Sequence, residues 1–214
     1  MFPLLAKRQV ESTFELRSFR KADQVALATV INENWGLKSS QKNAELAQRF
    51  GYAYLYYNLA CSSFRGVAEY NGYAAGIVCA GSRKQKLPNL AYLLKAMTYA
   101  LPLLFCREFK EQIATWKKIF SFARSQEKKL PREYKGKLYL LLTNSSCRGM
   151  GMGKKLLSSA EDYFILNGMK ETFLCTDGNL SFYEAHGYKK VQDTVIQSEN
   201  CGSLSREIAL LTNS

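Results

Sequence analysis

The chain is poor in the residues that mark metal sites and the common hydrolases. Among its 214 residues there is one histidine, His186, and there are four prolines. His186 falls in the last turn of a predicted short helix, where a positive charge suits the helix dipole. That is the simpler explanation of the residue, and a Ser-His-Asp hydrolase is not indicated.

Closely spaced cysteines are also missing. The six cysteines contain no C-x-x-C pair, and Cys79 and Cys175 stand in apolar runs, where a free thiol behaves as a small hydrophobic group. This pattern is typical of a reduced cytoplasm and predicts no metal site. The opening MFPLLAKRQ lacks the apolar segment and cleavage site of a signal peptide, so we expect a cytoplasmic protein.

Long uninterrupted apolar runs are absent as well. The most apolar stretch, residues 90–106, is broken by Lys95 and Pro102 and falls short of a comfortable membrane span. We therefore predict a buried helix at this position and no interaction with a membrane.

Acidic residues are scarce, with 18 Asp and Glu against 30 Lys and Arg, a net charge of +12. Residues 83–137 hold 14 of the basic residues and four glutamates, which gives +10 and leaves +2 elsewhere. Such a segment either attracts an anion such as nucleic acid or forms a solvated helical face. Trp116, Phe120 and Phe122 fall largely on the apolar stripe of the predicted helix. We expect them in the core, which argues against nucleic acid as a partner.

Apolar material is plentiful, because hydrophobic residues make up 47% of the chain, enough to pack one sizeable domain. The order of predicted elements describes a mixed α/β domain. In sequence they are strand 14–20, helices 21–34 and 43–59, a hairpin with a type I′ turn at Asn71-Gly72, a mostly helical segment 88–130, strand 136–143, a helix from about 152 to 167, strand 171–176, a short helix near 179–186 ended by Gly187, and closing strands.

The glycine-rich segment CRGMGMGKK, residues 147–155, lies between a predicted buried strand and a helix. A Walker loop requires G-x-x-x-x-G-K-[ST], but Arg148 stands at its first position and Lys155 at its last. The glycines at 149, 151 and 153 also lie too far along the chain for a dinucleotide fingerprint. What the segment satisfies is R-x-x-G-x-G. Its glycines free backbone N–H groups to face a phosphate beside the positive end of a helix, although a connector without a ligand is the alternative.

The motifs resemble those of the GNAT superfamily of N-acetyltransferases. CRGMGMGKKLLSSA is followed by FYEAHGY (182–188) in the family's order and spacing, and VAEYNGYAAGIV (67–78) is similar to its second and third strands. The resemblance is strong over about 63–81 and 137–190. It implies one domain, 1–214, of α/β (mixed α+β) class: a twisted mixed sheet with helices on both faces and a helical insertion at about 83–136 between strands 3 and 4.

The resemblance further implies acetyl-CoA as the acyl donor and no metal. The backbone of Leu142 and Thr143 would pair with the pantetheine arm, which requires an exposed strand edge. Asn179 would either hydrogen-bond the cofactor or serve the start of the short helix. The pyrophosphate would be held by Arg148, Gly149, Met150, Gly151, Met152, Gly153 and Lys154.

Three residues are candidates for the chemistry. Tyr183 would protonate the leaving thiolate, because a phenol with a pKa near 10 keeps its proton at neutral pH. Asp177 either caps the following helix or lies near the acceptor amine. The strand before the glycine loop carries no carboxylate, so Glu69 is the nearest general base, acting through water, unless it is simply a solvent-facing strand residue.

We therefore expect an N-acetyltransferase that moves an acetyl group from acetyl-CoA to a primary amine by direct attack. The substrate would be a small amine, an amino acid or a peptide N-terminus, because a basic insertion beside the acceptor argues against a polycation. The alternative is a non-catalytic acyl-CoA-binding or nucleic-acid-binding module on the same fold. The sequence leaves open whether the protein is a monomer or a homodimer.

Overall fold

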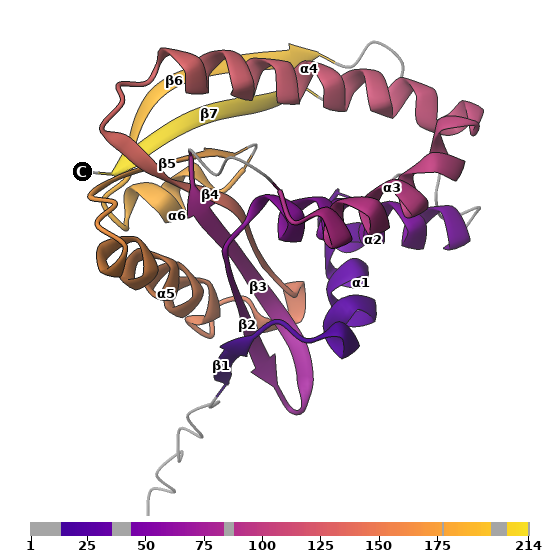
Figure 1. Ribbon diagram of the computed structural model, residues 1–214, viewed down its shortest axis with the longest axis horizontal. Coiled ribbons are helices and arrows are strands. Elements are labelled where there is room, and N and C mark those ends of the chain that lie inside the picture. Colours follow the sequence, from indigo (N-terminus) through magenta and orange to yellow (C-terminus); the bar gives the residue numbers. More distant parts are fainter. Residues whose placement is uncertain (1–13, 36–43, 84–87, 177, 198–204, 214) are drawn as a thin grey trace, which may run out of the picture.

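The computed structural model describes five stretches of the chain (Figure 1), and in three segments it describes the backbone alone. The stretches are 14–35, 44–83, 88–176, 178–197 and 205–213, and the backbone-only segments are 107–116, 192–197 and 205–210.

The elements follow the order predicted from the sequence, which is confirmed. The helices are α1 (Gln24–Trp35), α2 (Ala44–Cys61), α3 (Leu90–Leu104), α4 (Arg107–Lys129), α5 (Met152–Leu166) and α6 (Leu180–Glu184). The strands are β1 (Glu15–Ser18), β2 (Phe64–Tyr70), β3 (Tyr73–Ser82), β4 (Tyr134–Thr143), β5 (Glu171–Thr176), β6 (Lys189–Gln197) and β7 (Ser205–Asn213).

The seven strands form one mixed sheet in the order β1-β2-β3-β4-β5-β7-β6. All neighbouring pairs are antiparallel except β4 and β5, which run parallel because α5 returns the chain between them. Asn71 and Gly72 have φ values of 52° and 81°, as a type I′ turn requires. The parallel pair is the irregular feature of the sheet, and the candidate site lies there.

Helices cover both faces of the sheet, and each face has its own core. On one face α5 supplies Leu156, Ala160 and Phe164, spaced four residues apart so that one helical stripe is buried. On the other face α1 and α2 pack together on β3 and β4. The sheet is therefore the middle layer of three, with helices on both sides, as the resemblance implied.

The insertion between β3 and β4 forms α3 and α4. Helix α3 packs on α2, while α4 runs alongside β6 and β7 (Figure 1). The prediction of a buried helix at 90–106 is wrong, because α3 buries only the face that carries Ala96 and Leu103. Its opposite side is solvent-exposed. The exposed apolar residues there are Leu90, Leu94, Met97, Leu101 and Leu104.

Helix α4 also corrects a prediction. Phe120 is not in the core: it is 44% exposed, and Ile119 beside it is buried instead. The buried stripe of this part of α4 is thus one residue out of phase with the predicted stripe, because the covered face depends on neighbouring elements, which the periodicity of α4 does not specify. The side chain of Trp116 lies outside the described ones.

Within the described residues, neither a membrane-spanning helix nor a metal-binding cluster is present. None of the helices there combines the length and the apolar character that crossing a membrane requires. Within the same residues, no group of three or more His, Cys, Asp or Glu side chains is arranged to hold a metal ion.

Candidate functional site

The candidate site begins with an irregularity in β4. Residues two apart in a regular strand share a face of the sheet. Leu138 nevertheless packs in the core under α5 and Leu140 in the opposite core, because the register with β3 shifts between Cys79 and Ala80. Tyr139 is therefore the extra residue of a β-bulge. A bulge turns the following side chains to the other face and increases the local twist.

The parallel strands separate at this bulge. The ladder between β4 and β5 ends at the pair Leu138–Leu174, although β4 continues to Thr143 and β5 to Thr176. Leu142 and Thr143 keep their pairing with β3. Among the described residues their other edge has no strand partner, so its backbone N–H and C=O groups are presented to a ligand. The predicted role of Leu142 and Thr143 requires a strand edge without a partner strand, and that role stays a prediction.

The glycine loop follows β4 directly. The backbone N–H of Asn144 donates to the Ala75 carbonyl at 2.7 Å, and the Asn144 side chain accepts from the N–H of Ser146 at 2.9 Å. Gly149 and Gly151 have φ values of 79° and 75°, which other residues adopt only with strain. A Cβ added at either position would meet no atom within 4 Å, so the loop is open on that side.

Helix α5 begins at this loop with uncovered N–H groups. Gly151 is its N-cap, no side chain caps it, and its first turn contains no acidic residue. The hydrogen bond from Lys155 N to Gly151 O, 3.1 Å long, closes the first turn. The N–H groups of residues 151–154 precede that bond and have no helical partner. Four donors at the positive end of the helix dipole form a site that suits a phosphate.

The side chains around the loop divide into two groups. Arg148 and Lys154 are exposed, and the Arg148 guanidinium donates to the Asn34 amide oxygen at 3.3 Å. Met152 is only 1% exposed, and Met150 packs against the same core. The two methionines can therefore offer a ligand their backbone, whereas Arg148 and Lys154 offer positive charge.

Helix α6 brings Tyr183 to the same end of the sheet. A Cβ on Gly153, in the first turn of α5, would lie 3.5 Å from the ring of Phe182. Tyr183 is 7% exposed and shares its core with Met152. Its ring meets those of Phe182 and Tyr188 edge-on, with centroids 5.1 and 5.9 Å apart. Tyr183 is thus packed in the core that also holds Met152, the first residue of α5.

The other predicted residues of this segment differ in what the structure says of them. Asn179 is exposed at the N-cap position of α6 with φ 53°, and its side chain makes no capping hydrogen bond. Thr176 closes the turn after β5 by donating its hydroxyl to the Gly178 carbonyl at 2.7 Å. Asp177 lies outside the described residues. His186 follows α6, where its ring nitrogen Nδ1 lies 2.7 Å from a backbone carbonyl oxygen of that helix.

Comparison with known proteins accounts for this arrangement. A sequence model of the Acetyltransferase (GNAT) family matches residues 30–188, most of the chain. The chain belongs to the GNAT family of acetyltransferases. It is therefore an acyltransferase by family. No match to a curated protein sequence was found.

Solved structures of other GNAT proteins share the fold. Arylalkylamine N-acetyltransferase 2 from Aedes aegypti has a TM-score of 0.60 at 14% identity, over 94% of this chain and 98% of that one. Arabidopsis thaliana Naa50, solved with the bisubstrate analogue CoA-Ac-MVNAL, has a TM-score of 0.52 at 15% identity over the same shares. The Brucella melitensis ribosomal-protein-alanine N-acetyltransferase has 0.50 at 14%, over 93% and 98%. At these identities the similarity shows the fold alone.

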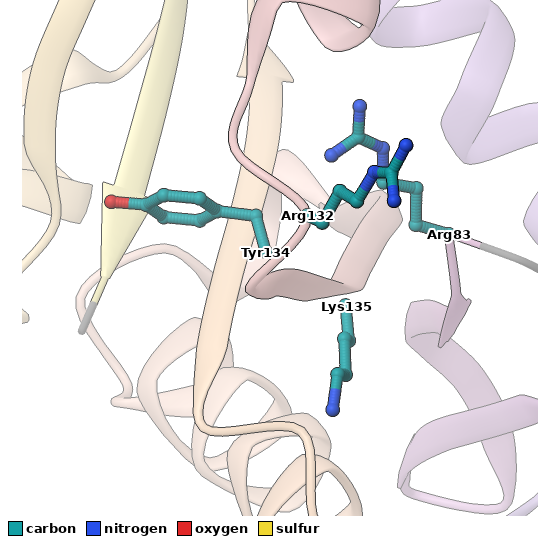
Figure 2. Close-up of a pocket in the computed structure, with 4 residues that line it drawn as sticks. All are labelled: Arg83, Arg132, Tyr134 and Lys135. Atoms are coloured by element: carbon teal, nitrogen blue, oxygen red, sulfur yellow. The ribbon is translucent and has the colours of Figure 1, made fainter.

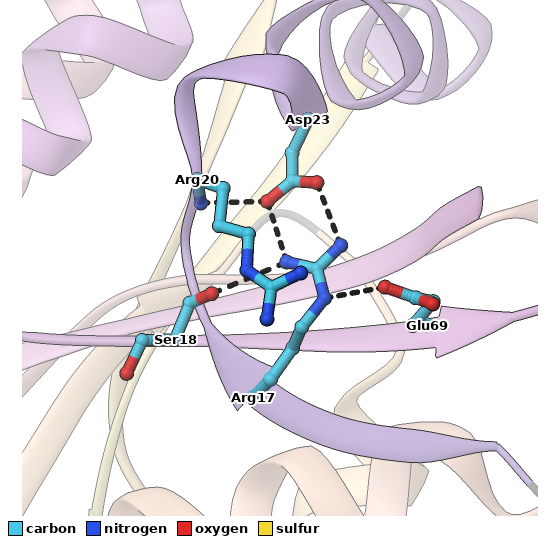
Figure 3. A network of polar contacts seen from close by, with 5 residues as sticks. All are labelled: Arg17, Ser18, Arg20, Asp23 and Glu69. Carbon is cyan, nitrogen blue, oxygen red and sulfur yellow. Dashed lines mark hydrogen bonds and ion pairs between the residues drawn. The ribbon is translucent and has the colours of Figure 1, made fainter. Parts of the chain in front are cut away.

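In this GNAT protein the proposed base, Glu69, takes part in a polar network (Figure 3). Its carboxylate pairs with the Nε of Arg17. The two terminal nitrogens of Arg17 each donate to a carboxylate oxygen of Asp23 at 2.7 Å. Glu69 is therefore neither a free base nor a purely solvent-facing residue, because one of its oxygens is occupied by Arg17.

Asp23 is the buried member of this network, and its charge is expected to stabilise the fold. Burial alone would raise the pKa of Asp23, but hydrogen bonds from Arg17 and from the Arg20 backbone outweigh it, so the pKa lies below its ordinary value. Asp23→Asn should lower the free energy of unfolding by about 3 kcal/mol at pH 7, because it leaves part of a buried ion pair without its partner. Urea unfolding measures this difference.

The pH dependence of that loss provides a check. Because the folded pKa is lowered, the stabilisation is present above the unfolded pKa, about 3.9, and is lost as the pH falls through the folded value. The difference between parent and Asp23→Asn should therefore shrink toward pH 3. Asp162→Asn, an exposed change on α5, should alter stability by less than about 0.5 kcal/mol. A gap that stays constant with pH would contradict the assignment.

The GNAT chain also has a basic pocket of about 290 Å³ at the opposite end of β4 from the glycine loop (Figure 2). The Arg83 guanidinium donates to the carbonyls of Leu130, at 3.2 Å, and of Pro131, at 2.8 Å. Arg83 thus stabilises the C-terminal end of α4, and the pocket lies away from the glycine loop. The lining residues are Arg83, Arg132, Tyr134 and Lys135.

Proposed function

We propose that this GNAT protein transfers the acetyl group of acetyl-CoA to a primary amine, carried by a small amine, an amino acid or a peptide N-terminus. The observation that supports it most is the open strand edge at the Tyr139 bulge next to the uncovered N–H groups of α5. The first suits a pantetheine arm and the second suits a pyrophosphate. The Naa50 structure, which holds a CoA-peptide analogue, is consistent with this assignment.

The donor would be held mainly by backbone groups. The N–H groups of 151–154 would bind the pyrophosphate, with Arg148 and Lys154 adding charge-assisted contacts. The free edge of Leu142 and Thr143 would pair with the pantetheine amides, and an N–H there would polarise the thioester carbonyl. Asn179 is exposed at the start of α6 and would add a hydrogen bond.

Bound acetyl-CoA supplies an activated acetyl thioester. The amine nitrogen would form a bond to the carbonyl carbon while the carbon–sulfur bond breaks, so the transfer needs no acyl-enzyme. Tyr183 would give its phenolic proton to the departing sulfur, and the amine would release one proton. The exchange balances, because Tyr183 recovers a proton from solvent after each turnover.

The amine proton has two candidate acceptors, Glu69 and Asp177. Glu69 would take it through water by the carboxylate oxygen that Arg17 leaves available. Asp177 stays a second candidate for accepting this proton, although it lies outside the described residues. An amine that arrives deprotonated would need neither residue, and transfer would then rise with the pH of the medium.

Two measurements on the intact chain test the proposal. Calorimetry with acetyl-CoA should detect binding, and thiol release against a panel of primary amines should detect transfer. Binding without transfer to any amine would favour the non-catalytic module instead. A salt-dependent shift on generic RNA would add weight to that alternative. Absence of acetyl-CoA binding would refute the donor site.

A further inference from the structure

The two faces of the sheet would serve different substrates. The uncovered N–H groups of α5 lie at the end of the helix that covers one face. Beyond Leu138 the ladder between β4 and β5 ends, which leaves a gap in the pairing, and Tyr139 there packs against the core of the other face, where α1 and α2 lie. An acceptor that attacks a thioester held in this gap therefore arrives from the α2 side.

The inserted helix α4 reaches that same face by two contacts. Glu127 of α4 pairs with Lys137 of β4, with 2.7 Å between carboxylate oxygen and ammonium nitrogen. Phe120, two turns earlier, meets the ring of Tyr57 on α2 edge-on, with 6.0 Å between centroids. Lys137 stands one residue before Leu138, so α4 is anchored next to the point where the strands separate.

The groups around this point are aromatic and basic, since Lys137 is joined by Arg124 near Tyr57 and by Arg83 near Phe173. The Lys137 ammonium lies 5.0 Å from the ring centre of Tyr139 and 5.8 Å from that of Phe173. Glu127 balances its charge. Burial raises the pKa of Tyr57 to about 12 and raises that of Tyr139, so both phenols stay uncharged at neutral pH.

Tyr57 and Phe120 keep surface for a ligand. They are 42% and 44% exposed, although each touches the other across two helices. Aromatic rings offer apolar contact and an electron-rich face to an ammonium group or to another ring. A polyamine carries several positive charges and would need carboxylates that are not already paired. The carboxylate of Glu127 is paired with Lys137.

We propose that Tyr57 and Phe120 form the wall that selects the acceptor, and that the preferred acceptor is a primary amine carried on an aromatic group. The proposal rests on the proposed amine acetyltransfer and narrows its substrate class. The inserted helix α4 then determines specificity, because it supplies one of the two rings.

The test compares three amines on the intact protein: 2-phenylethylamine, ethylamine and spermidine. The parent should use 2-phenylethylamine with the highest kcat/KM. Phe120→Ala and Tyr57→Ala should each lower kcat/KM for 2-phenylethylamine about tenfold, mainly by raising KM, since loss of apolar contact weakens binding rather than chemistry. For ethylamine, which is too short to reach the rings, the change should be less than about twofold.

Controls separate this effect from damage to the fold. Tyr73→Ala removes a ring that is 75% exposed on the β2–β3 hairpin and should leave all three amines unchanged. Phe120→Leu keeps an apolar side chain and should retain most of the preference. Acetyl-CoA affinity should be the same in every variant, because the donor would bind on the other face. Unchanged affinity also shows that each variant is folded.

Each outcome has a definite meaning. Transfer to amines with no loss of preference in Phe120→Ala and Tyr57→Ala would overturn the proposal while leaving acetyltransfer intact. So would a parent that prefers spermidine. Acetyl-CoA binding with no transfer to any amine would overturn the proposed function itself, and this proposal with it.

Discussion

Gly151→Glu is expected to weaken acetyl-CoA binding by more than about 100-fold. Gly151 has φ 75°, and the space beside it is open, so a side chain placed there would point into the region assigned to the pyrophosphate. A carboxylate facing a phosphate costs several kcal/mol, and each 1.4 kcal/mol is tenfold in affinity. Calorimetry of parent and variant with acetyl-CoA measures the difference.

The hairpin turn supplies a matched control for backbone strain. Gly72 has φ 81°, and a Cβ there would also meet nothing within 4 Å, so Gly72→Glu carries the same penalty in the same open surroundings. Either substitution should destabilise the fold by about 1 to 2 kcal/mol, because an L-residue is held in the left-handed region. Only the change at 151 should affect binding. Equal loss of affinity in both variants would show that strain, rather than the glycine loop, is responsible.

The sequence predicted those parts of the fold and of the site that depend on the conformation of the local backbone. Asn71-Gly72 and Gly187 lie at positive φ, as the turn and the helix end demand. The glycines of the loop were recognisable for the same reason, because their role is a property of their own backbone. The family motifs then identified Tyr183, which follows the loop along the chain in the family's order and spacing.

What the sequence could not predict depends on partners across the fold. Tyr139 becomes a bulge only because β3 pairs with β4 in a shifted register, and no local pattern marks that shift. The engagement of Glu69 by Arg17 joins residues 52 positions apart. The apolar character of Phe120 and of α3 predicts that both are buried, but burial depends on which faces the neighbouring helices cover. Phe120 and α3 belong to the segment inserted between β3 and β4.

Tyr183→Phe is expected to lower kcat about 100-fold while leaving acetyl-CoA affinity unchanged. The substitution removes only the hydroxyl, and the ring keeps its edge-on contacts with Phe182 and Tyr188. A positioned general acid contributes roughly 100-fold or more to a proton transfer. Because the hydroxyl is proposed to act on the departing sulfur, the loss should appear in kcat and kcat/KM alike. Thiol release measured at saturating acetyl-CoA over a range of amine concentrations gives both kcat and kcat/KM.

Tyr188→Phe is the natural comparison, because Tyr188 is buried in the same core and also loses only a hydroxyl. Burial raises the pKa of Tyr188 to about 12, and its hydroxyl lies near Thr172 of β5 and Glu161 of α5. Its loss should leave kcat unchanged within about twofold. An acetyl thioester donor whose leaving thiol is more acidic than coenzyme A should also recover part of the Tyr183→Phe loss, since a better leaving group depends less on protonation. If Tyr183→Phe turned over as fast as the parent, the proton would have to reach the sulfur from water, and Tyr183 would be a packing residue of α6.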